Sequence, residues 1–275
     1  MTFLDFCRLH GLMIDYLPPL GVWRRYPTED HPRKRNGAAK YMGDHGFVQN
    51  HATETAVSVW KSDRPADIET QVKRRQNAGK TQAAQEEAAR KAAWIISKSV
   101  PFEHDYLFNK GFSGMKGLSW QTDDAVLLVI PMKVGDRLVG CQLISPDGTK
   151  KFLTGQRTSG ATFTMNARGP HILVEGYATG LSVRLICESL KMPYTIHVCF
   201  SAGNLAKVAA TLPAGLVIAD NDASGTGERV AKETGWPYWM SDVVGEDAND
   251  AWRRLGTFRM SQDLRSLLSQ FRHRA

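Results

Sequence analysis

The chain has 275 residues, of which 42% are hydrophobic, so it can bury the core of one large or two modest globular domains, and a disordered chain is excluded. Its formal net charge of +7 favours a polyanionic partner, although charge alone does not distinguish a nucleic acid from a membrane surface. No apolar run approaches the roughly 20 residues that span a bilayer, and the amino-terminal sequence lacks the order of a signal peptide. We therefore expect a cytoplasmic protein that does not enter a membrane.

The four cysteines argue against both a zinc site and a disulfide framework. Cys7, Cys141, Cys187 and Cys199 show no CxxC spacing, and three of them lie within apolar runs. A thiol in such a run packs as a small core residue. We expect no bound zinc.

The first region, residues 1–64, begins with a short helical stretch and continues with alternating, turn-rich sequence that is typical of a small β-sheet. Within it, Arg24 and Arg25 lie beside Trp23 and Tyr26. Basic and aromatic side chains in this arrangement can hold backbone phosphates and stack the bases of a single strand. A solvated loop explains the same residues equally well.

The second region, residues 65–100, is rich in Ala, Gln, Lys and Arg and has no proline after Pro65. This composition predicts a long, exposed, basic helix that separates the two halves of the chain. The sequence GKT at residues 79–81 lacks the upstream glycine and the preceding strand of a nucleotide-binding P-loop. An NTPase site is therefore excluded here.

The remaining sequence divides into three parts. Residues 101–168 hold two apolar runs joined by KVGDR and followed by the turn SPDGTKK, which predicts antiparallel strands. Residues 169–256 alternate between strands and helices in the order βαβαβαβ, which predicts a parallel sheet with helices on its faces. Residues 257–275 predict a basic amphipathic helix, which we expect to dock on its own domain rather than on DNA or a partner.

Acidic residues stand where the predicted parallel strands end. Glu175 follows the first strand, and Asp220 and Asp222 follow the third. A later acidic loop adds Glu246, Asp247 and Asp250. Functional groups gather at the carboxyl ends of parallel strands, and carboxylate oxygens suit Mg²⁺ or Mn²⁺. An aspartate after a strand is also often a helix N-cap, but acids from three strand ends, without an obvious cation in the three loops, predict a metal site.

At these positions the sequence resembles the Toprim family, the metal-binding domain of bacterial-type primases, topoisomerases and some small nucleases. The family pattern is a glutamate after the first strand and D-x-D after the third, which Glu175 in VEGYATGLSV and Asp220 and Asp222 in IADNDASGTG match. GEDANDAW resembles the later acidic loop of the primases, at Asp247 and Asp250. HDYLFNKGF, LLVIPMKVGDRLVGCQLISPDGTKKFLTG and CFSAGNLAKVA are similar to segments of conjugative-plasmid and phage primases.

The resemblance implies an α+β protein with an α/β Toprim domain at residues 169–256, in which helices flank a parallel sheet. The amino-terminal part of the primase core would precede it at residues 101–168. Residues 1–64 would be zinc-ribbon-like, yet the aligned stretch has no cysteine and only scattered histidines, so we expect that sheet to lack zinc ligands. Thr179 replaces a second acid that chromosomal primases carry four residues after the glutamate, as it does in the plasmid-type proteins.

The resemblance also implies an activity, the Mg²⁺-dependent synthesis of RNA primers on single-stranded DNA in plasmid or phage replication. The partners would be the template, ribonucleoside triphosphates and a separate replicative helicase. Glu175 would be a metal ligand or a general base. The resemblance further assigns two sets of residues, metal ligands at Asp220, Asp222, Asp250 and Asp247, and contacts to nucleic-acid or nucleotide phosphates at Lys110, Lys150 and Lys151. Taken alone, each lysine is better explained as a solvated surface charge.

Asn204 stands at the start of the second helix of the predicted parallel-sheet region, beside the same sheet edge. Free backbone N–H groups at this helix start can meet a phosphate, or Asn204 can act as an ordinary N-cap.

Two other functions stay open. A Toprim nuclease would use the same acids with water as the nucleophile. A non-catalytic DNA-binding accessory protein of a mobile element would keep the fold without the chemistry. The β-rich region before the acids favours the primase over the nuclease, and the complete set of acids argues against the accessory protein.

Overall fold

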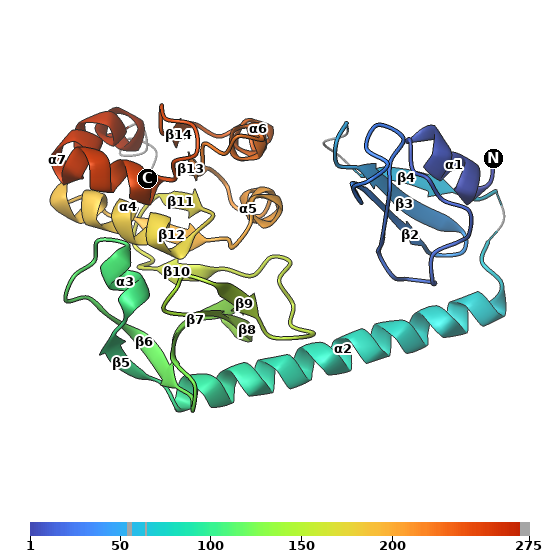
Figure 1. The fold of residues 1–275 in the computed structure, drawn as a ribbon, viewed down its shortest axis with the longest axis horizontal. Coiled ribbons are helices and arrows are strands. Elements are labelled where there is room, and N and C mark those ends of the chain that lie inside the picture. The colour runs from blue at the N-terminus through green and yellow to red at the C-terminus, as the bar shows by residue number, and fades with distance from the viewer. Residues whose placement is uncertain (54–56, 64, 270–275) are drawn as a thin grey trace. The chain divides into compact units, whose positions relative to one another are not determined.

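Helix α2 (Ile68–Ser97) contains the boundary between two compact units, Met1–Ala83 and Ala84–Ala275 (Figure 1). The computed structural model describes residues 1–53, 57–63 and 65–269. The long helix predicted within residues 65–100 is present, and in its second half only Ala88, Ala92 and Ile95 are buried. These three residues recur at helical spacing, so one narrow apolar stripe packs while the other faces stay in water. The helix is therefore shared by the two units and is not a free linker.

The first unit is built on an antiparallel sheet with the strand order β1-β2-β3-β4. Its strands are β1 (Arg24–Tyr26), β2 (Gly37–Tyr41), β3 (His45–Asn50) and β4 (Ser58–Lys61). Helix α1 (Phe3–Leu9) packs on this sheet through Phe3, whose ring lies 5.3 Å from that of Tyr41 and 5.5 Å from that of Trp60. Gly46 leaves room for the ring, because a Cβ atom there would lie 2.2 Å from it.

The second unit contains an antiparallel sheet with the order β5-β6-β7-β8-β9. It comprises β5 (Val100–Glu103), β6 (Lys116–Gln121), β7 (Val126–Val134), β8 (Arg137–Ile144) and β9 (Lys150–Phe152), with α3 (Asp105–Asn109) between β5 and β6. One face, with Val129 and Cys141, packs on the second half of α2. The opposite face, with Ile130 and Ile144, shares a core with the parallel strands described next.

The third sheet has the order β10-β12-β11-β13-β14, and all its neighbouring strands are parallel except β10 and β12. Its elements are β10 (Phe163–Met165), β11 (His171–Val174), α4 (Tyr177–Ser189), β12 (Thr195–Val198), α5 (Ala202–Ala209), β13 (Gly215–Ala219), α6 (Thr226–Glu233) and β14 (Tyr238–Met240). The alternation predicted from residue 171 onward is confirmed. The predicted boundary at residue 168 is wrong, because β10 pairs with β12 and so belongs to this sheet.

The two faces of the parallel strands bury alternate residues, as the pleat of a strand requires. Ile172 and Ile218 lie in one core with residues of α4 and α7 (Ala248–Ser269). Leu173 and Val217 lie in the other, with residues of α5 and α6. Helices therefore cover both faces of the sheet (Figure 1).

Helix α7 is interrupted at Gly256, where φ is +79° and ψ is 164°. Glycine adopts this backbone conformation without a steric penalty. After the interruption, Met260 and Leu264 are fully buried in the core of the second unit, so the carboxyl-terminal helix docks on its own unit as expected. Residues 270–275 of the predicted helix lie outside the described residues. Within the described part of the chain, no helix is both long and apolar enough to cross a bilayer.

Candidate active site at the carboxyl edge of the parallel sheet

Glu175 and Asp220 lie at the ends of two neighbouring parallel strands. Val174 of β11 is opposite Ile218 of β13, so the two acids leave the sheet at the same edge. The loop after β12 reaches the same place, because the N–H of Phe200 donates to the carbonyl oxygen of Glu175 at 2.8 Å. The structure therefore gathers the loops that follow three adjacent strands.

The surroundings of Asp220 disfavour the charged form of its carboxyl group. Burial, together with the charges of Glu175, Asp247 and Asp222, raises the pKa of Asp220 to about 7. Its Oδ1 atom is buried and has no hydrogen-bond partner among the described residues. A buried carboxylate oxygen without a donor is unfavourable, and acids with such strongly raised pKa values mark candidate functional sites. Burial also raises the pKa of Glu175, against the opposing charge of Lys150.

Asp222 has a different environment. Its carboxylate accepts hydrogen bonds from the N–H of Gly227 at 2.8 Å, from the N–H of Thr226 at 3.3 Å, and from both the N–H and the hydroxyl of Ser224. Although burial acts in the opposite direction, these bonds hold the pKa of Asp222 below its usual range. The capping role considered from the sequence is therefore present at Asp222, which satisfies the first turn of α6.

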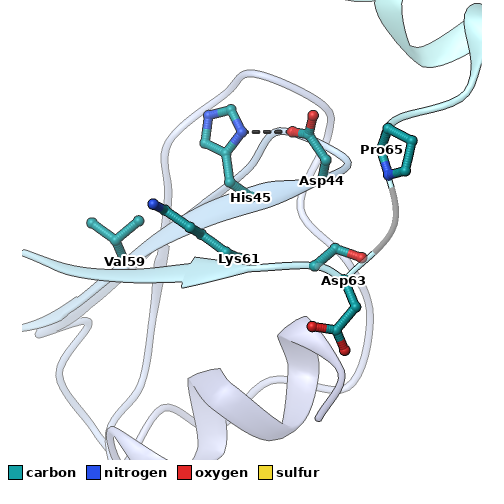
Figure 2. Close-up of a pocket in the computed structure, with 7 residues that line it drawn as sticks. Asp44, His45, Val59, Lys61, Asp63 and Pro65 are labelled. Carbon is teal, nitrogen blue, oxygen red and sulfur yellow. Dashed lines mark hydrogen bonds and ion pairs between the residues drawn. The ribbon is translucent and has the colours of Figure 1, made fainter.

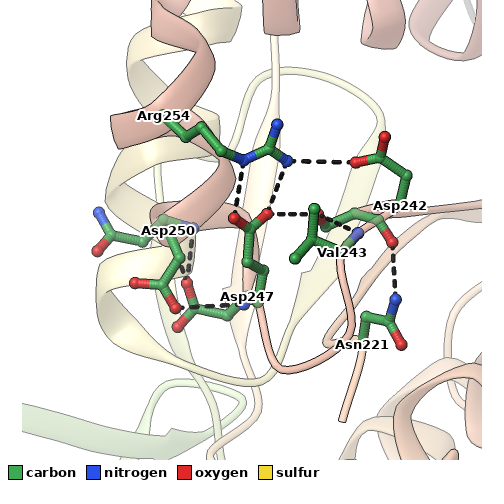
Figure 3. A network of polar contacts seen from close by, with 9 residues as sticks. Asn221, Asp242, Val243, Asp247, Asp250 and Arg254 are labelled. Atoms are coloured by element: carbon green, nitrogen blue, oxygen red, sulfur yellow. Dashed lines mark hydrogen bonds and ion pairs between the residues drawn. The ribbon is translucent and has the colours of Figure 1, made fainter. Parts of the chain in front are cut away.

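Asp247 and Asp250 lie at the start of α7. The Asp247 carboxylate accepts the N–H groups of Asn249 at 2.8 Å and Asp250 at 2.9 Å, so Asp247 caps this helix (Figure 3). Asp250 lies 3.6 Å from the ammonium group of Lys110. Both acids thus have local structural partners, while the charge of Asp247 still acts on Asp220.

The carboxyl edge of the parallel sheet, with Glu175, Asp220 and the loops that carry Asp222, Glu246, Asp247 and Asp250, is called the acidic edge below. It has cationic neighbours that the loop sequences do not contain. Arg254 of α7 donates two hydrogen bonds of 2.8 Å to Glu246 and one of 3.2 Å to Asp242 (Figure 3). Its guanidinium group is the main reason that the pKa of Glu246 is lowered to about 2. Lys110 and Lys150 supply further positive charge. The three loops themselves contain no such cation, as the sequence indicated, and the cationic partners come from α7, from the end of α3 and from β9.

The donor set at this edge fits a divalent cation in chemistry but does not form a closed cage. Within residues 1–53, 57–63 and 65–269, no three His, Cys, Asp or Glu side chains lie close enough together to hold a metal ion. The predicted cage of Glu175, Asp220 and Asp222 is therefore not formed in this arrangement, since Asp222 is turned toward α6. Asp220, with an unpartnered buried oxygen, is the acid best suited to a cation.

Lys150 faces the acids and Lys151 does not. On β9, Lys150 is opposite Ile144 and Lys151 is opposite Leu143. Ile144 lies in the core shared with the parallel sheet, whereas Leu143 packs toward α2. Directly opposed residues share a face, so only Lys150 points to the acidic edge. Its charge accordingly opposes the rise in the pKa values of Glu175 and Asp220 that burial causes.

A hollow of about 360 Å³ lies beside this edge, lined by Lys110, Lys150 and Arg253 among others. Tyr106 also lines it, and burial and the charge of Asp247 raise the pKa of this tyrosine well above its usual range. Three cationic side chains around one hollow make a basic wall next to the acids. Arg253 and Tyr106 were missed from the sequence, although Tyr106 lies in the segment HDYLFNKGF that carries part of the resemblance.

Asn249 is a further residue that the sequence did not single out. It is fully buried, and its amide donates to the carbonyl oxygen of Lys110 and to the hydroxyl of Ser182, both at 3.0 Å. Its own oxygen Oδ1 is buried without a hydrogen-bond partner among the described residues, and so is the hydroxyl of Thr179 in α4. The signal for Asn249 was its place within the acidic loop GEDAND.

The structure gives Asn204 a structural role. Its amide accepts the N–H of Gly160 at 2.7 Å and donates to the carbonyl oxygens of Ala161 and Cys199, both at 2.8 Å. Ser201 caps α5 instead, because its side chain accepts the N–H of Asn204. The alternative of Asn204 as an N-cap is wrong, and its amide is already bonded to the loop before β10.

Arg24 and Arg25 lie on β1 of the first unit, and both are exposed. They line two hollows, one of about 520 Å³ with Arg35 and Tyr16 and one of about 320 Å³ with Trp23. Basic and aromatic side chains therefore do share a surface there, as the sequence suggested.

Another hollow of the first unit, of about 460 Å³, is lined by Asp44, His45 and Lys61 (Figure 2). The Asp44 carboxylate pairs with Arg74 and lies 2.6 Å from Nδ1 of His45. The Arg74 guanidinium, the main cause, and His45 hold the pKa of Asp44 well below its usual range, although burial opposes them. His45 is thus paired with a carboxylate, and no cluster of metal ligands surrounds it in the described residues.

No family model matches the chain. A DNA primase domain from Pseudomonas aeruginosa is a similar solved structure, with a TM-score of 0.34 and 15% sequence identity. The similarity covers 62% of this chain and 57% of that one, so the match spans less than two thirds of the primase domain. Values this low demonstrate neither a common fold nor a common activity.

Proposed function

We propose that this protein is a primase-type nucleotidyltransferase of the Toprim class that joins ribonucleotides on single-stranded DNA in the replication of a plasmid or phage. The observation that carries the proposal is the carboxyl group of Asp220. It is buried at the carboxyl edge of a parallel sheet, without a hydrogen-bond donor on Oδ1, and next to Glu175 and Lys150. Its raised pKa supports the proposal, because the charged form is unfavourable there and a bound cation would relieve it.

Glu175 and Asp220 would hold Mg²⁺ or Mn²⁺, and Asp247 and Asp250 would join them only by giving up the cap of α7 and the pairing with Lys110. Asp222 would join them only by giving up its bonds to α6. Carboxylate oxygens are the ligands that these hard cations prefer. When bound, the cation would stabilise the charge on the attacking and leaving oxygens of a phosphoryl transfer.

The protein's own side chains would bind and orient the reactants. Lys150, Lys110 and Arg253 would hold the phosphates of a ribonucleoside triphosphate in the basic hollow. The 3′-oxygen of one nucleotide would bond to the α-phosphorus of the next, and the bond to the β-phosphate oxygen would break and release pyrophosphate. Glu175, whose pKa is raised by burial, would accept the proton of the 3′-hydroxyl if it is not a ligand of the cation, and otherwise water would accept that proton.

The first unit would bind the template strand. Arg24 and Arg25 are exposed beside Trp23, so they can contact phosphates while the indole stacks on a base. This surface needs no base-specific contact, which suits a strand of varied sequence. A separate helicase would supply the single-stranded template, as the resemblance to plasmid and phage primases implies.

The test is incubation of the full chain with single-stranded DNA, labelled ribonucleotides and Mg²⁺ or Mn²⁺. We expect labelled oligoribonucleotides, and we expect Asp220→Asn to reduce their yield by on the order of 100-fold. Asp136→Asn is the matched control, since Asp136 is an exposed aspartate in the turn between β7 and β8. Binding of single-stranded DNA should be equal in all three proteins, because the proposed binding residues lie elsewhere.

Three outcomes would contradict the proposal. Undiminished synthesis by Asp220→Asn would remove the acid from the chemistry. Metal-dependent cleavage of nucleic acid without synthesis would identify a Toprim nuclease. Binding of single-stranded DNA with neither synthesis nor cleavage would identify a non-catalytic accessory protein.

A further inference from the structure

Two phenylalanines stand next to the acidic edge, and the proposed chemistry does not use them. Phe152 is on β9, and its side chain is 43% exposed. Its ring meets that of Phe200 edge to face, with centroids 6.1 Å apart and planes at 83°. This geometry is a favourable one for two aromatic rings, and it leaves much of Phe152 open to solvent.

Phe200 is held in an unusual backbone conformation. Its φ is +68°, in the left-handed region that bulky residues rarely adopt. Its N–H donates to the carbonyl oxygen of Glu175, and the N–H of Cys199 donates to that of Val174, both at 2.8 Å. Strained residues of this kind cluster at functional sites, where the surrounding structure fixes them. Phe200 therefore has a fixed position beside Glu175.

Phe152 shares a strand face with Lys150. The two residues are two positions apart on β9, opposite Gln142 and Ile144 of β8, so their side chains leave the same face about 7 Å apart. Lys150 acts electrostatically on Glu175 and Asp220. An exposed aromatic ring and a cation at this spacing match the two ends of a nucleotide, its flat base and its phosphate.

We propose that Phe152, supported by Phe200, stacks on a nucleobase at the carboxyl edge while Lys150 contacts the phosphate of the same nucleotide. This inference rests on the proposed function and adds a residue that positions the substrate. Every base has an aromatic face, so this stacking contact can form with any base but cannot form at an abasic position. The base belongs either to the template strand or to an incoming ribonucleotide, and the experiment separates these two sources.

The experiment compares Phe152→Ala and Phe152→Trp with the unaltered protein. Phe102→Ala is the matched control, because Phe102 is 57% exposed on β5, at the opposite edge of the same sheet. Affinities are measured for a single-stranded oligonucleotide, for an abasic strand of the same length and for ribonucleoside triphosphates. We expect Phe152→Ala to weaken one base-bearing ligand roughly 5- to 150-fold and to leave the abasic strand unchanged. Phe152→Trp should retain affinity, and Phe102→Ala should bind like the unaltered protein.

A change confined to the oligonucleotide assigns the stacked base to the template, and a change confined to the ribonucleotides assigns it to the incoming nucleotide. Equal loss for base-bearing and abasic strands, or no loss for any ligand, would overturn the stacking role. If the unaltered protein synthesises primers and Phe152→Ala binds normally, only the inference about Phe152 fails. If the unaltered protein binds neither ligand, the proposed function fails with it.

Discussion

Replacing Asp220 by Asn removes a charge that opposes folding. The folded pKa of about 7 exceeds the ordinary value of 3.8 by about 3, which corresponds to about 4 kcal/mol at 1.36 kcal/mol for each pKa unit. Because the folded protein favours the protonated carboxyl group, the unfavourable contribution of Asp220 is absent at low pH and grows as the pH rises from 4 to 7. Asn cannot ionise, so the variant should escape this contribution.

We therefore expect Asp220→Asn to be more stable than the unaltered protein by up to about 4 kcal/mol at pH 8 without divalent cations. The difference should shrink to near zero at pH 4. Hydrogen exchange of peptides from β13, followed through a urea titration, reports the free energy of opening of the second unit. Asp136→Asn, in an exposed turn, should show no such pH-dependent gain.

Adding Mg²⁺ extends the same test. A cation that binds only the folded state stabilises it by mass action, so the unaltered protein should gain stability and Asp220→Asn should gain much less. A stability difference between the two proteins that is the same at pH 4 and pH 8 would refute the raised pKa. Equal stabilisation of both by Mg²⁺ would refute the role of Asp220 as a ligand.

Three other measurements follow from the structure. Asp222→Ala should lower the thermal unfolding temperature and destabilise the second unit by about 1–2 kcal/mol, because the Asp222 carboxylate caps α6. An unchanged unfolding temperature would contradict this capping role. Burial, with a smaller effect of His171, lowers the pKa of His197 from 6.5 to about 4. Protonation of this residue therefore opposes folding, and the free energy of unfolding should fall by up to about 3 kcal/mol as the pH falls from 6.5 to 4. His197→Gln should lose less stability over this range in acid unfolding, and an identical loss would refute the assignment. Changing Arg24 and Arg25 to Ala should weaken binding of single-stranded DNA, and the slope of log K against log salt concentration should become less steep by about 0.7 for each lost phosphate contact. An unchanged slope in a salt titration would exclude these arginines as phosphate contacts.

The parallel-sheet region could be predicted from the sequence because its strands are short apolar runs that end on acids. HILV before Glu175 and GLVIA before Asp220 are buried on both faces, and this pattern fixes which end of each strand reaches solvent. The partner strands could not be predicted in the same way. Nothing in residues 163–165 shows that β10 leaves the preceding module and pairs with β12.

The orientation of individual side chains was beyond the sequence. Lys150 and Lys151 are adjacent and chemically identical, and only the register of β9 on β8 shows which one faces the acids. Asp220 and Asp222 belong to one D-x-D motif, yet one is buried without a donor on Oδ1 and the other caps α6. These differences depend on tertiary packing, which local sequence patterns do not contain.

The hydrogen bonds of the buried Asn249 amide can form only after most of the second unit has been synthesised. It bonds to the carbonyl oxygen of Lys110, 139 residues earlier in the chain, and to Ser182, 67 residues earlier. Contacts between such distant segments need both segments to be present, and the entropy of closing the intervening loops opposes them before they stabilise the fold. The ribosome must therefore release nearly the whole unit before α3, α4 and α7 can meet, and a nascent chain that stops before Asn249 holds its acids without the helix that completes their site.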